Sequence, residues 1–474
     1  MYPKKSIKLT LTLCLLLLLV LFTSCAAGKE PEPPKENNSD KISTKIDAYT
    51  TDLLDSSDSM QSNQAILKYL SDWAEAKKID HYLDKAGNLI FTRGASEGYG
   101  QCAPTVLLCP CDYRQYQQCI PPIAMSLYLI KNTEDAGRLT VIYTPSEGDR
   151  YKALSSLDQN LLPDNAGILT LNPGPKGVFA TSSAAGSTYR FQLKGKRADP
   201  QLTAAYQIQI TGLPTYFPDA RVDQAVNPIS ELENILTWIN NRKDSFELAS
   251  FHSGIDQSLY APSASMTITI DANDEAAFLE KMGDLQEKWT EKYSKDYPDS
   301  ALTYQKTDLP KKVYNADTTH RLVSFMYTLL NGEYYRDDEG NLLSICSITG
   351  ISTEKKTIRI ISSAYSLDET VLKEIDNGEM TLANLSGAGF ETIHALPLWN
   401  GVEDSDFTKA IKKSYDKISG KSLHYDRSVA PTCTGYVQSL TKSQDLLSIT
   451  VSDNIVKECT ETILDYMSSL KEVE

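Results

Sequence analysis

Apolar and polar positions follow two different rhythms along this chain. From about Ile46 to Gly186, short apolar runs are separated by segments in which apolar residues recur every three or four positions. Thr105 to Cys109 is typical of a buried strand, and Gln64 to Lys77 is typical of an amphipathic helix. Strands that alternate with helices predict a mostly parallel sheet covered by helices on both faces. The other predicted strands are Asn88 to Thr92, Leu139 to Tyr143 and Gly167 to Leu171, and the other predicted helices are Ile120 to Ile130 and Ala153 to Leu162.

The pattern changes near Gly186 and changes back near residue 387. In between, strands with period-two alternation, such as Tyr206 to Thr211 and Ser265 to Ile270, are followed by long helical segments. This pattern is typical of an α+β domain. We therefore predict an α/β domain built from residues 46–186 and 387–474, interrupted by an inserted α+β domain of residues 187–386.

The first 24 residues predict a signal peptide. Three lysines within the first eight residues precede an apolar run from Leu9 to Phe22. That run is about 14 residues long, whereas a helix that spans a membrane needs about 20. It ends at Ser24-Cys25, where Leu21 to Cys25 resembles the lipobox of bacterial lipoproteins, although Phe22 stands where Leu is more usual.

Cys25 is therefore the predicted lipid anchor. The alternative is an ordinary signal peptide followed by an incidental cysteine. Residues 25–45 are polar and rich in proline, which predicts a tether between the anchor and the first domain. We expect the protein on the extracytoplasmic face of a bacterial membrane, held there by lipid.

Composition and charge indicate the class of protein and exclude one class of partner, nucleic acid. The 474 residues, with 41% hydrophobic and 23% charged side chains, indicate a globular protein of more than one domain. The 47 basic and 62 acidic residues leave a net charge of -15. We expect no nucleic-acid partner, because binding to phosphate requires a basic surface.

Seven cysteines remain beyond the signal peptide and Cys25, and they admit three interpretations. Disulfides are the ordinary expectation outside the cytoplasm, with one cysteine left unpaired. Buried free thiols are the second. A metal site built from Cys109, Cys111, Asp112 and Cys433 is the third.

An ordered set of short motifs carries a family resemblance. The motifs are Asp84 to Ile90, Pro104 to Leu108 followed by Asp112, Tyr143 to Glu147, Gly177 to Phe179 with Ala184 to Gly186, and Leu396 to Trp399 followed by Asp404-Ser405. In this order they resemble the aminoacyl-histidine dipeptidase (peptidase D) branch of the di-zinc metallopeptidases. The resemblance covers about residues 46 to 474. It implies a zinc-binding α/β domain split by a ferredoxin-like lid.

The resemblance also implies a chemistry. In that family two zinc ions polarise the peptide carbonyl and activate a bridging water, and a glutamate takes the proton of the water. Glu147 falls on the position of this general base. Asp112 falls where the family has the aspartate that orients a histidine ligand. We expect both residues to be vestigial.

All five positions where the family has its metal ligands carry residues that bind zinc poorly or not at all. They are Pro110, Gln117, Gly148, Asn172 and the histidine-free segment around Val429. Zinc sites need His, Cys, Asp or Glu ligands. The sequence therefore predicts a cleft that uses no metal cofactor.

These observations favour a pseudo-peptidase that has the fold and has lost the hydrolysis. Its expected partners are peptides or amino acids in the former cleft, a protein partner, or a second copy of the chain bound through the lid. The alternatives are an active metal-dependent dipeptidase with an atypical site and a surface scaffold without a small ligand.

Overall fold

The computed structural model describes residues 38–148, 150–215, 226–241, 246–254 and 258–471. The predicted signal peptide, the predicted anchor Cys25 and the tether up to residue 37 lie outside the described residues. Apart from the first turns of α2 (Asn38–Asp55), every element lies in one compact unit, Lys45–Glu474. None of the helices in the described part of the chain is both long and apolar enough to span a membrane.

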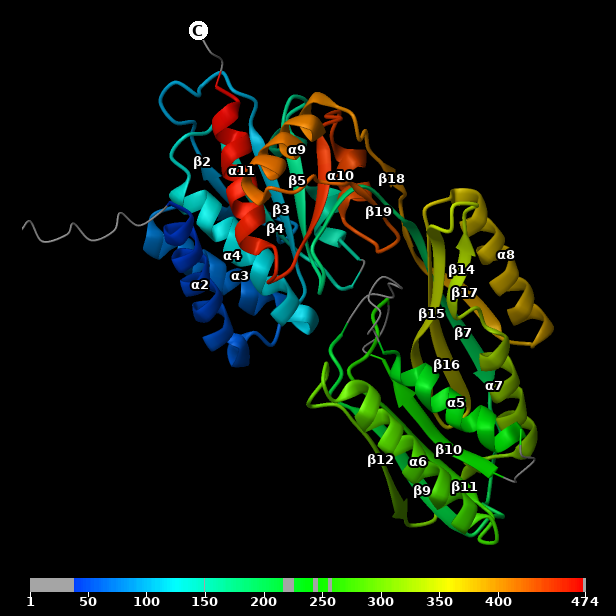
Figure 1. The fold of residues 1–474 in the computed structure, drawn as a ribbon. Helices are drawn as coiled ribbons and strands as arrows, with labels where there is room; N and C mark the ends of the chain where they lie inside the picture. The colour runs from blue at the N-terminus through cyan, green and yellow to red at the C-terminus, as the bar shows by residue number, and fades with distance from the viewer. Residues whose placement is uncertain (1–37, 149, 216–225, 242–245, 255–257, 472–474) are drawn as a thin grey trace, which may run out of the picture. The chain divides into compact units, whose positions relative to one another are not determined.

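The first sheet has a parallel centre (Figure 1). The described residues contribute nine strands, in the order β1-β2-β4-β3-β5-β20-β6-β18, with β19 beside β6. Neighbours among β4, β3, β5 and β20 run parallel. The nine strands are β1 (Asp80–Leu83), β2 (Leu89–Arg93), β3 (Thr105–Cys111), β4 (Leu139–Pro145), β5 (Gly167–Pro173), β6 (Val178–Ser183), β18 (Trp399–Asn400), β19 (Asp426–Ser428) and β20 (Leu446–Val451).

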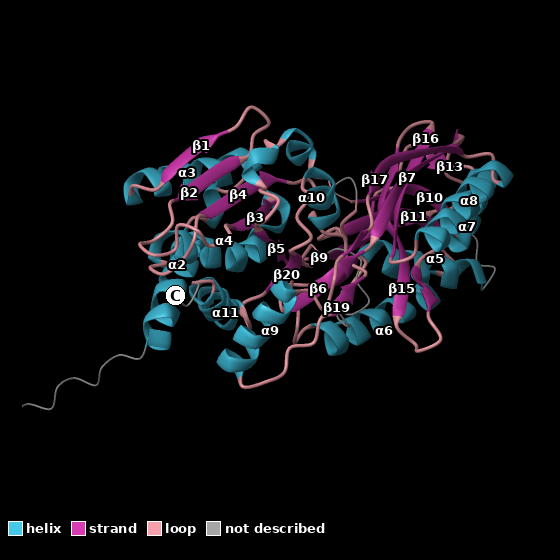
Figure 2. Cartoon of the chain, turned by 90° about the horizontal axis from the view of Figure 1, so that it is seen from above, coloured by secondary structure: helices cyan, strands magenta, loops and turns pink. Residues whose placement is uncertain are grey.

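Helices cover both faces of this sheet, so the central strands are buried along almost their whole length. All seven residues of β3 are buried. Val106 and Leu108 pack with Leu154 and Val437 on one face, beside α10, while α4 lies against β3, β4 and β5 on the other (Figure 2). The helices of this part are α3 (Asn63–Lys77), α4 (Tyr116–Asn132), α9 (Asp406–Ser419), α10 (Thr434–Leu440) and α11 (Val456–Ser469).

The second sheet is antiparallel in every pairing. Its order is β12-β9-β11-β10-β15-β16-β7-β17, with β14 beside β15, among the residues that the structure describes. The strands are β7 (Ala185–Lys194), β9 (Ala204–Thr211), β10 (Phe246–Ser253), β11 (Ala264–Ile270), β12 (Ala301–Thr307), β14 (Gly332–Arg336), β15 (Leu342–Thr353), β16 (Thr357–Ser366) and β17 (Gly389–Leu396), while β8 (Arg197–Ala198) and β13 (Val313–Tyr314) form a separate pair. Its helices are α5 (Pro228–Asn241), α6 (Glu275–Tyr293), α7 (Ala316–Thr328) and α8 (Glu369–Leu385).

The predicted fold class is confirmed: an α/β part, whose sheet has a parallel core and antiparallel pairings on both sides of it, is combined with an α+β part. In sequence order, the first strand of the second sheet is β7 and the last is β17. These two strands pair with each other. Strand β17 follows residue 386, which is the predicted end of the insertion. The domain limits themselves stay a prediction.

Two local predictions need correction. The helix predicted at Ala153 to Leu162 is wrong, because this segment forms two short 3-10 turns, Lys152–Ser156 and Gln159–Leu161. Asp158 has an extended backbone and accepts the N–H of Asn160, so it begins a new turn and interrupts a continuous helix. Residues 38–45 of the predicted tether belong to α2, where Ile42, Ile46 and Leu53 recur at helical spacing.

Candidate functional site

The parallel strands β3, β4, β5 and β20 end at one edge of the first sheet. Ligands of open α/β sheets usually bind at this carboxyl edge. A cavity of about 480 Å³ lies there, where β5 and β20 end. Its lining includes Asn172 and Pro173 from β5, Thr450 from β20, and the segment that runs from Ser422 to Asp426.

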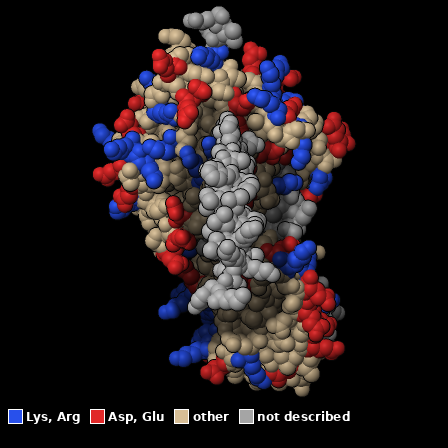
Figure 3. Space-filling model, turned by 60° about the vertical axis from the view of Figure 1, so that its left-hand side comes forward, with Lys and Arg blue, Asp and Glu red and all other residues tan. Residues whose placement is uncertain are grey.

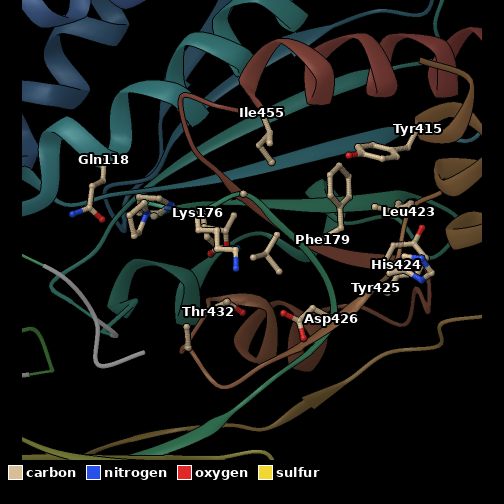
Figure 4. A pocket seen from close by; sticks show the side chains of 18 of the residues that line it. Gln118, Lys176, Phe179, Tyr415, Leu423, His424, Tyr425, Asp426, Thr432 and Ile455 are labelled. Carbon is tan, nitrogen blue, oxygen red and sulfur yellow. The ribbon is translucent and has the colours of Figure 1, made fainter. Parts of the chain in front are cut away.

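The cavity has an apolar side and a polar side. Phe179, Tyr415 and Ile455 lie along one side, and Lys176 and Asp426 lie along the other (Figure 4). The rings of Phe179 and Tyr415 meet edge to face, with their centroids 5.3 Å apart. Burial raises the pKa of the Tyr415 phenol, so this group is neutral at neutral pH. The arrangement suits a small molecule with an apolar group and a charged or polar end.

Asn172 lies at the end of β5 in a network of neutral side chains. Its Nδ2 donates to Ser448 Oγ at 3.0 Å, and its Oδ1 accepts the weak S–H donor of Cys433 at 3.9 Å. Thr170 Oγ1 and Thr434 Oγ1 are 2.6 Å apart. Because these groups satisfy one another, this end of the sheet needs no bound cation to balance charge.

The network continues between the start of α10 and the end of β6. Thr432 Oγ1 lies 2.9 Å from both Thr434 Oγ1 and Ser183 Oγ. Thr432 also lines the cavity. The polar floor of the cavity is therefore built from hydroxyl and amide groups.

Asp112 directly follows β3 and is 1% exposed. Its carboxylate accepts hydrogen bonds from Arg114 Nε at 2.8 Å and from Arg114 Nη2 at 2.6 Å, a bidentate ion pair. The backbone N–H of Gly148, after β4, donates to the same carboxylate at 2.7 Å. Burial lowers the pKa of the Arg114 guanidinium, but its bonds to Asp112 outweigh this effect and raise the pKa overall. The charge of Asp112 is thus balanced by the chain itself.

Gly148 adopts a left-handed backbone with φ +65°. A Cβ atom at this position would lie 2.5 Å from Ser258 Oγ. Because L residues rarely adopt this conformation, a glutamate could not take the place of Gly148 without a local change.

The other predicted site residues lie in different settings. Glu147 is exposed, and its backbone pairs with that of Arg150. Gln117 is also exposed, whereas the next residue on α4, Gln118, lines the cavity and donates to the carbonyl of Thr215 at 2.6 Å. Pro110 is buried within β3, beside Thr144 of β4.

Val429 is buried in a small apolar cluster with Ala184 and Tyr365. Its neighbour Ala430 lines the cavity. Of the predicted positions, the structure therefore brings Asn172 and the segment around Val429 to the cavity, and it joins Asp112 to Gly148. Gln117 does not line the cavity, and the charge of Glu147 contributes, after the bonds to Asp112, to the raised pKa of the Arg114 guanidinium.

Several cavity residues were missed by the sequence analysis, among them Lys176, Phe179, Tyr415 and Asp426. Phe179 belongs to the motif Gly177 to Phe179, which was recognised without a role in the site, and one signal was available for Lys176. Residues Pro173 to Gly177 form a run rich in Pro and Gly directly after a buried strand, which marks a turn at the edge of a sheet. Tyr415 and Asp426 come from distant segments and had no comparable signal.

The disulfide interpretation of the cysteines is wrong. All seven cysteines in the described part of the chain are free, and six of them are buried. Burial raises the pKa of Cys109 and of Cys119 to about 12, which disfavours the thiolate form that binds metals.

The donor set at the carboxyl edge does not fit two zinc ions. The Asp112 carboxylate is occupied by Arg114, and the side chains around Asn172 are neutral and hydrogen-bonded to each other. Within the described ranges, no three His, Cys, Asp or Glu side chains group together in a way that could hold a metal ion.

On the face drawn in Figure 3, basic and acidic side chains are interspersed.

No family model and no curated protein matches the sequence. Solved structures do match the fold. Aminoacylhistidine dipeptidase from Vibrio alginolyticus is similar with a TM-score of 0.55 and 17% identity, over 91% of this chain and 99% of that chain. A tripeptidase from Staphylococcus aureus gives a TM-score of 0.48 and 10% identity over 90% of this chain and 98% of its own. The dipeptidase Dug1p from Saccharomyces cerevisiae gives 0.48 and 11% over 92% and 99%.

The first of these similarities extends over nearly the full length of both chains. It confirms, at the level of the fold, the resemblance to the aminoacyl-histidine dipeptidases that the motifs predicted. At 17% identity this similarity shows the fold alone. The chemistry of the site therefore follows only from the residues of this chain.

Proposed function

We propose that this protein binds peptides or amino acids at the carboxyl edge of its first sheet and does not hydrolyse them. The observation that carries the proposal is the balance of charge at this edge. Asp112 forms its ion pair with Arg114, and the positions expected to hold zinc carry neutral groups. Without a metal to activate water, the dipeptidase mechanism has no nucleophile.

The cavity suits the chemistry of a short peptide. Lys176 is exposed and lines the cavity, where its ammonium group can attract a carboxylate. Asp426 lines the same cavity and can accept hydrogen bonds from an amino group. The rings of Phe179 and Tyr415 offer an apolar surface for a side chain. A dipeptide with an aromatic residue combines these three features.

Calorimetry with two dipeptides tests the binding. We expect Gly-Phe to bind the purified protein and Gly-Gly to bind at least tenfold more weakly, because the latter has no apolar side chain. The Lys176→Gln variant should weaken the binding of Gly-Phe about fivefold, which corresponds to about 1 kcal/mol. Lys85→Gln, an exposed lysine outside the cavity, is the matched control. Equal binding of both dipeptides, or none, would contradict the proposal.

Metal analysis tests the absence of hydrolysis. We expect less than one zinc per chain and no release of amino acids from dipeptides. Pro110→His should not restore hydrolysis, because one histidine does not make a di-zinc site. Stoichiometric zinc, together with a peptidase activity that a chelator abolishes, would favour the active dipeptidase instead.

We further propose that lipid on Cys25 holds the protein at the outer side of a bacterial membrane. The support is the signal-like N-terminus and the lipobox-like Leu21 to Cys25. A membrane location would place the cavity where peptides from the surroundings can reach it.

A further inference from the structure

A second cavity, of about 240 Å³, lies between helices α5 and α6 on the second sheet. Its floor includes Ile210 of β9 and Leu302 of β12, which are direct partners across the two strands. Trp238 of α5 and Leu285 and Trp289 of α6 also line it. Figure 1 shows both helices over this end of the sheet. The lower part of the cavity is therefore apolar and aromatic.

Three lysines also line this cavity. They are Lys281, Lys288 and Lys292, and all three come from α6. Lys281 Nζ lies 5.7 Å from the centroid of the Trp238 ring, and Lys292 Nζ lies 4.6 Å from that of Tyr293. Both distances are within the range of cation–π contacts.

The positive charge of these lysines is only weakly balanced. Within the described residues, none of the three forms a salt bridge within 4.0 Å. Glu231 is the one acidic residue among the described residues that line the cavity, and it accepts a hydrogen bond from Tyr293 OH at 3.2 Å. The bond to Tyr293 and the charge of Glu231 both raise the pKa of the Lys292 ammonium group. The cavity is therefore cationic in a chain whose net charge is -15.

The acidic and the basic residues of helix α6 lie on different sides of the helix. The acidic residues Glu280, Asp284, Glu287 and Glu291 recur at helical spacing and are all exposed. At 3.6 residues per turn, this acidic stripe lies about a quarter turn from the stripe of Lys281, Lys288 and Lys292. The lysines thus lie between the acidic stripe and the apolar face of the helix. In this position their long stems cover apolar surface while the ammonium groups remain at the rim.

We propose that this cavity binds a small amphiphilic carboxylate, with its apolar tail between Trp238 and Trp289 and its carboxylate at Lys288 and Lys292. The apolar floor accounts for the tail, and the three lysines that line the cavity account for the anionic head. A volume of about 240 Å³ lies below the range of drug-sized sites, about 300 to 1,000 Å³, and suits a single short chain or ring. This site is separate from the peptide cavity and does not depend on it.

Titration with decanoate, below the concentration at which it forms micelles, tests the proposal. Two of the four tryptophans of the chain line the cavity, so binding should change the intrinsic fluorescence of the full protein. We expect one saturable site by calorimetry. Decyltrimethylammonium, which has the same tail and a cationic head, should bind at least tenfold more weakly, and butyrate should bind weakly because its tail is short.

Variants locate the site. The double variant Lys288→Gln with Lys292→Gln should weaken the binding of decanoate at least tenfold, and Trp238→Phe should reduce the fluorescence change. Lys295→Gln, an exposed lysine just after α6 that does not line the cavity, should leave binding unchanged. The proposal is overturned if decanoate shows no saturable binding, if the cationic amphiphile binds equally well, or if the double variant binds like the wild type. Binding of anionic vesicles without binding of monomeric decanoate would also overturn it.

Discussion

At the scale of single residues, the buried charge of Asp112 is the central feature of the carboxyl edge of the first sheet. A buried carboxylate is costly unless it is paired and hydrogen-bonded. Here the partner is Arg114, two residues further along the chain, and the second donor is the backbone of Gly148. The ion pair is almost inaccessible, because the two side chains are 11% and 2% exposed.

Removal of one partner should therefore cost much more than removal of both. We expect Arg114→Met to lower the free energy of unfolding by about 3 kcal/mol, because it leaves the carboxylate buried and unpaired. The double variant Asp112→Asn with Arg114→Met should regain at least half of that loss. Urea denaturation measures both values.

The surface pair of Arg336 and Glu333 is the matched control. Its side chains are 47% and 45% exposed, so Arg336→Met should lower the free energy of unfolding far less than Arg114→Met does. If Arg114→Met lowers the free energy of unfolding no more than Arg336→Met does, the buried Asp112–Arg114 pair stabilises the protein no more than a surface pair.

Glu379 on α8 is a second buried carboxyl group, and within the described residues no lysine or arginine forms a salt bridge with it. It is 1% exposed, and neither of its oxygens has a hydrogen bond of good geometry. Burial raises its pKa from 4.5 to about 7, against a smaller lowering by the backbone of Leu330. The folded state therefore holds a proton that the unfolded state releases between pH 4.5 and about 7.

This gives a pH dependence with a definite sign. Stability contributed by the neutral carboxyl is fully present below pH 4.5 and is lost as the pH rises to about 7. Glu379→Gln should thus gain stability relative to the wild type across this window, by about 3 kcal/mol at most. Thermal denaturation from pH 4 to 8 measures the difference, with the exposed Glu374→Gln on the same helix as control. A difference that does not change with pH would contradict this assignment.

At the scale of elements, the turn after β4 fixes Gly148, one of the five positions where the resemblance places a metal ligand. Gly148 has a left-handed backbone and no room for a Cβ atom beside Ser258. The same turn directs the Gly148 N–H at Asp112. Strand end, turn and ion pair therefore support one another.

Substitution of Gly148 should be costly for this reason. We expect Gly148→Ala to lower the free energy of unfolding by about 1 to 3 kcal/mol through backbone strain and the contact with Ser258. Gly148→Glu should cost at least as much and should not raise the zinc content. Gly94→Ala, at a glycine with open space around it, is the control for chemical denaturation. A Gly148→Glu variant as stable as the wild type would refute the argument.

At the scale of the whole molecule, the prediction of a lipid anchor can be tested without reference to the cavity. If Cys25 is acylated, Cys25→Ser should leave the precursor unprocessed or release the protein into the medium. Fractionation of cells followed by immunoblotting measures this. Ser24→Ala, which keeps a small residue before the cysteine, should leave membrane association intact. Unchanged membrane association of Cys25→Ser would contradict the anchor.

The sequence by itself determined the fold class and the order of most elements. Burial periodicity is a local property, so buried strands such as Thr105–Cys111 and amphipathic helices such as Asn63–Lys77 are visible along the chain. The ordered motifs also determined the resemblance to the dipeptidases, because their spacing follows from the order of strands and loops. The segment at Ala153 to Leu162 escaped this reasoning, since one aspartate with an extended backbone was enough to divide a helix-like pattern.

Only the tertiary structure decided what the site residues do. Asn172 meets Ser448, 276 residues away, because β20 pairs with β5, and no local pattern predicts that pairing. The rotation of α4 decided that Gln118, and not Gln117, lines the cavity, since one residue along a helix turns the side chain by about 100°. The physical reason is the same in both cases: contacts between distant segments depend on strand order and helix rotation, which the whole packed molecule sets.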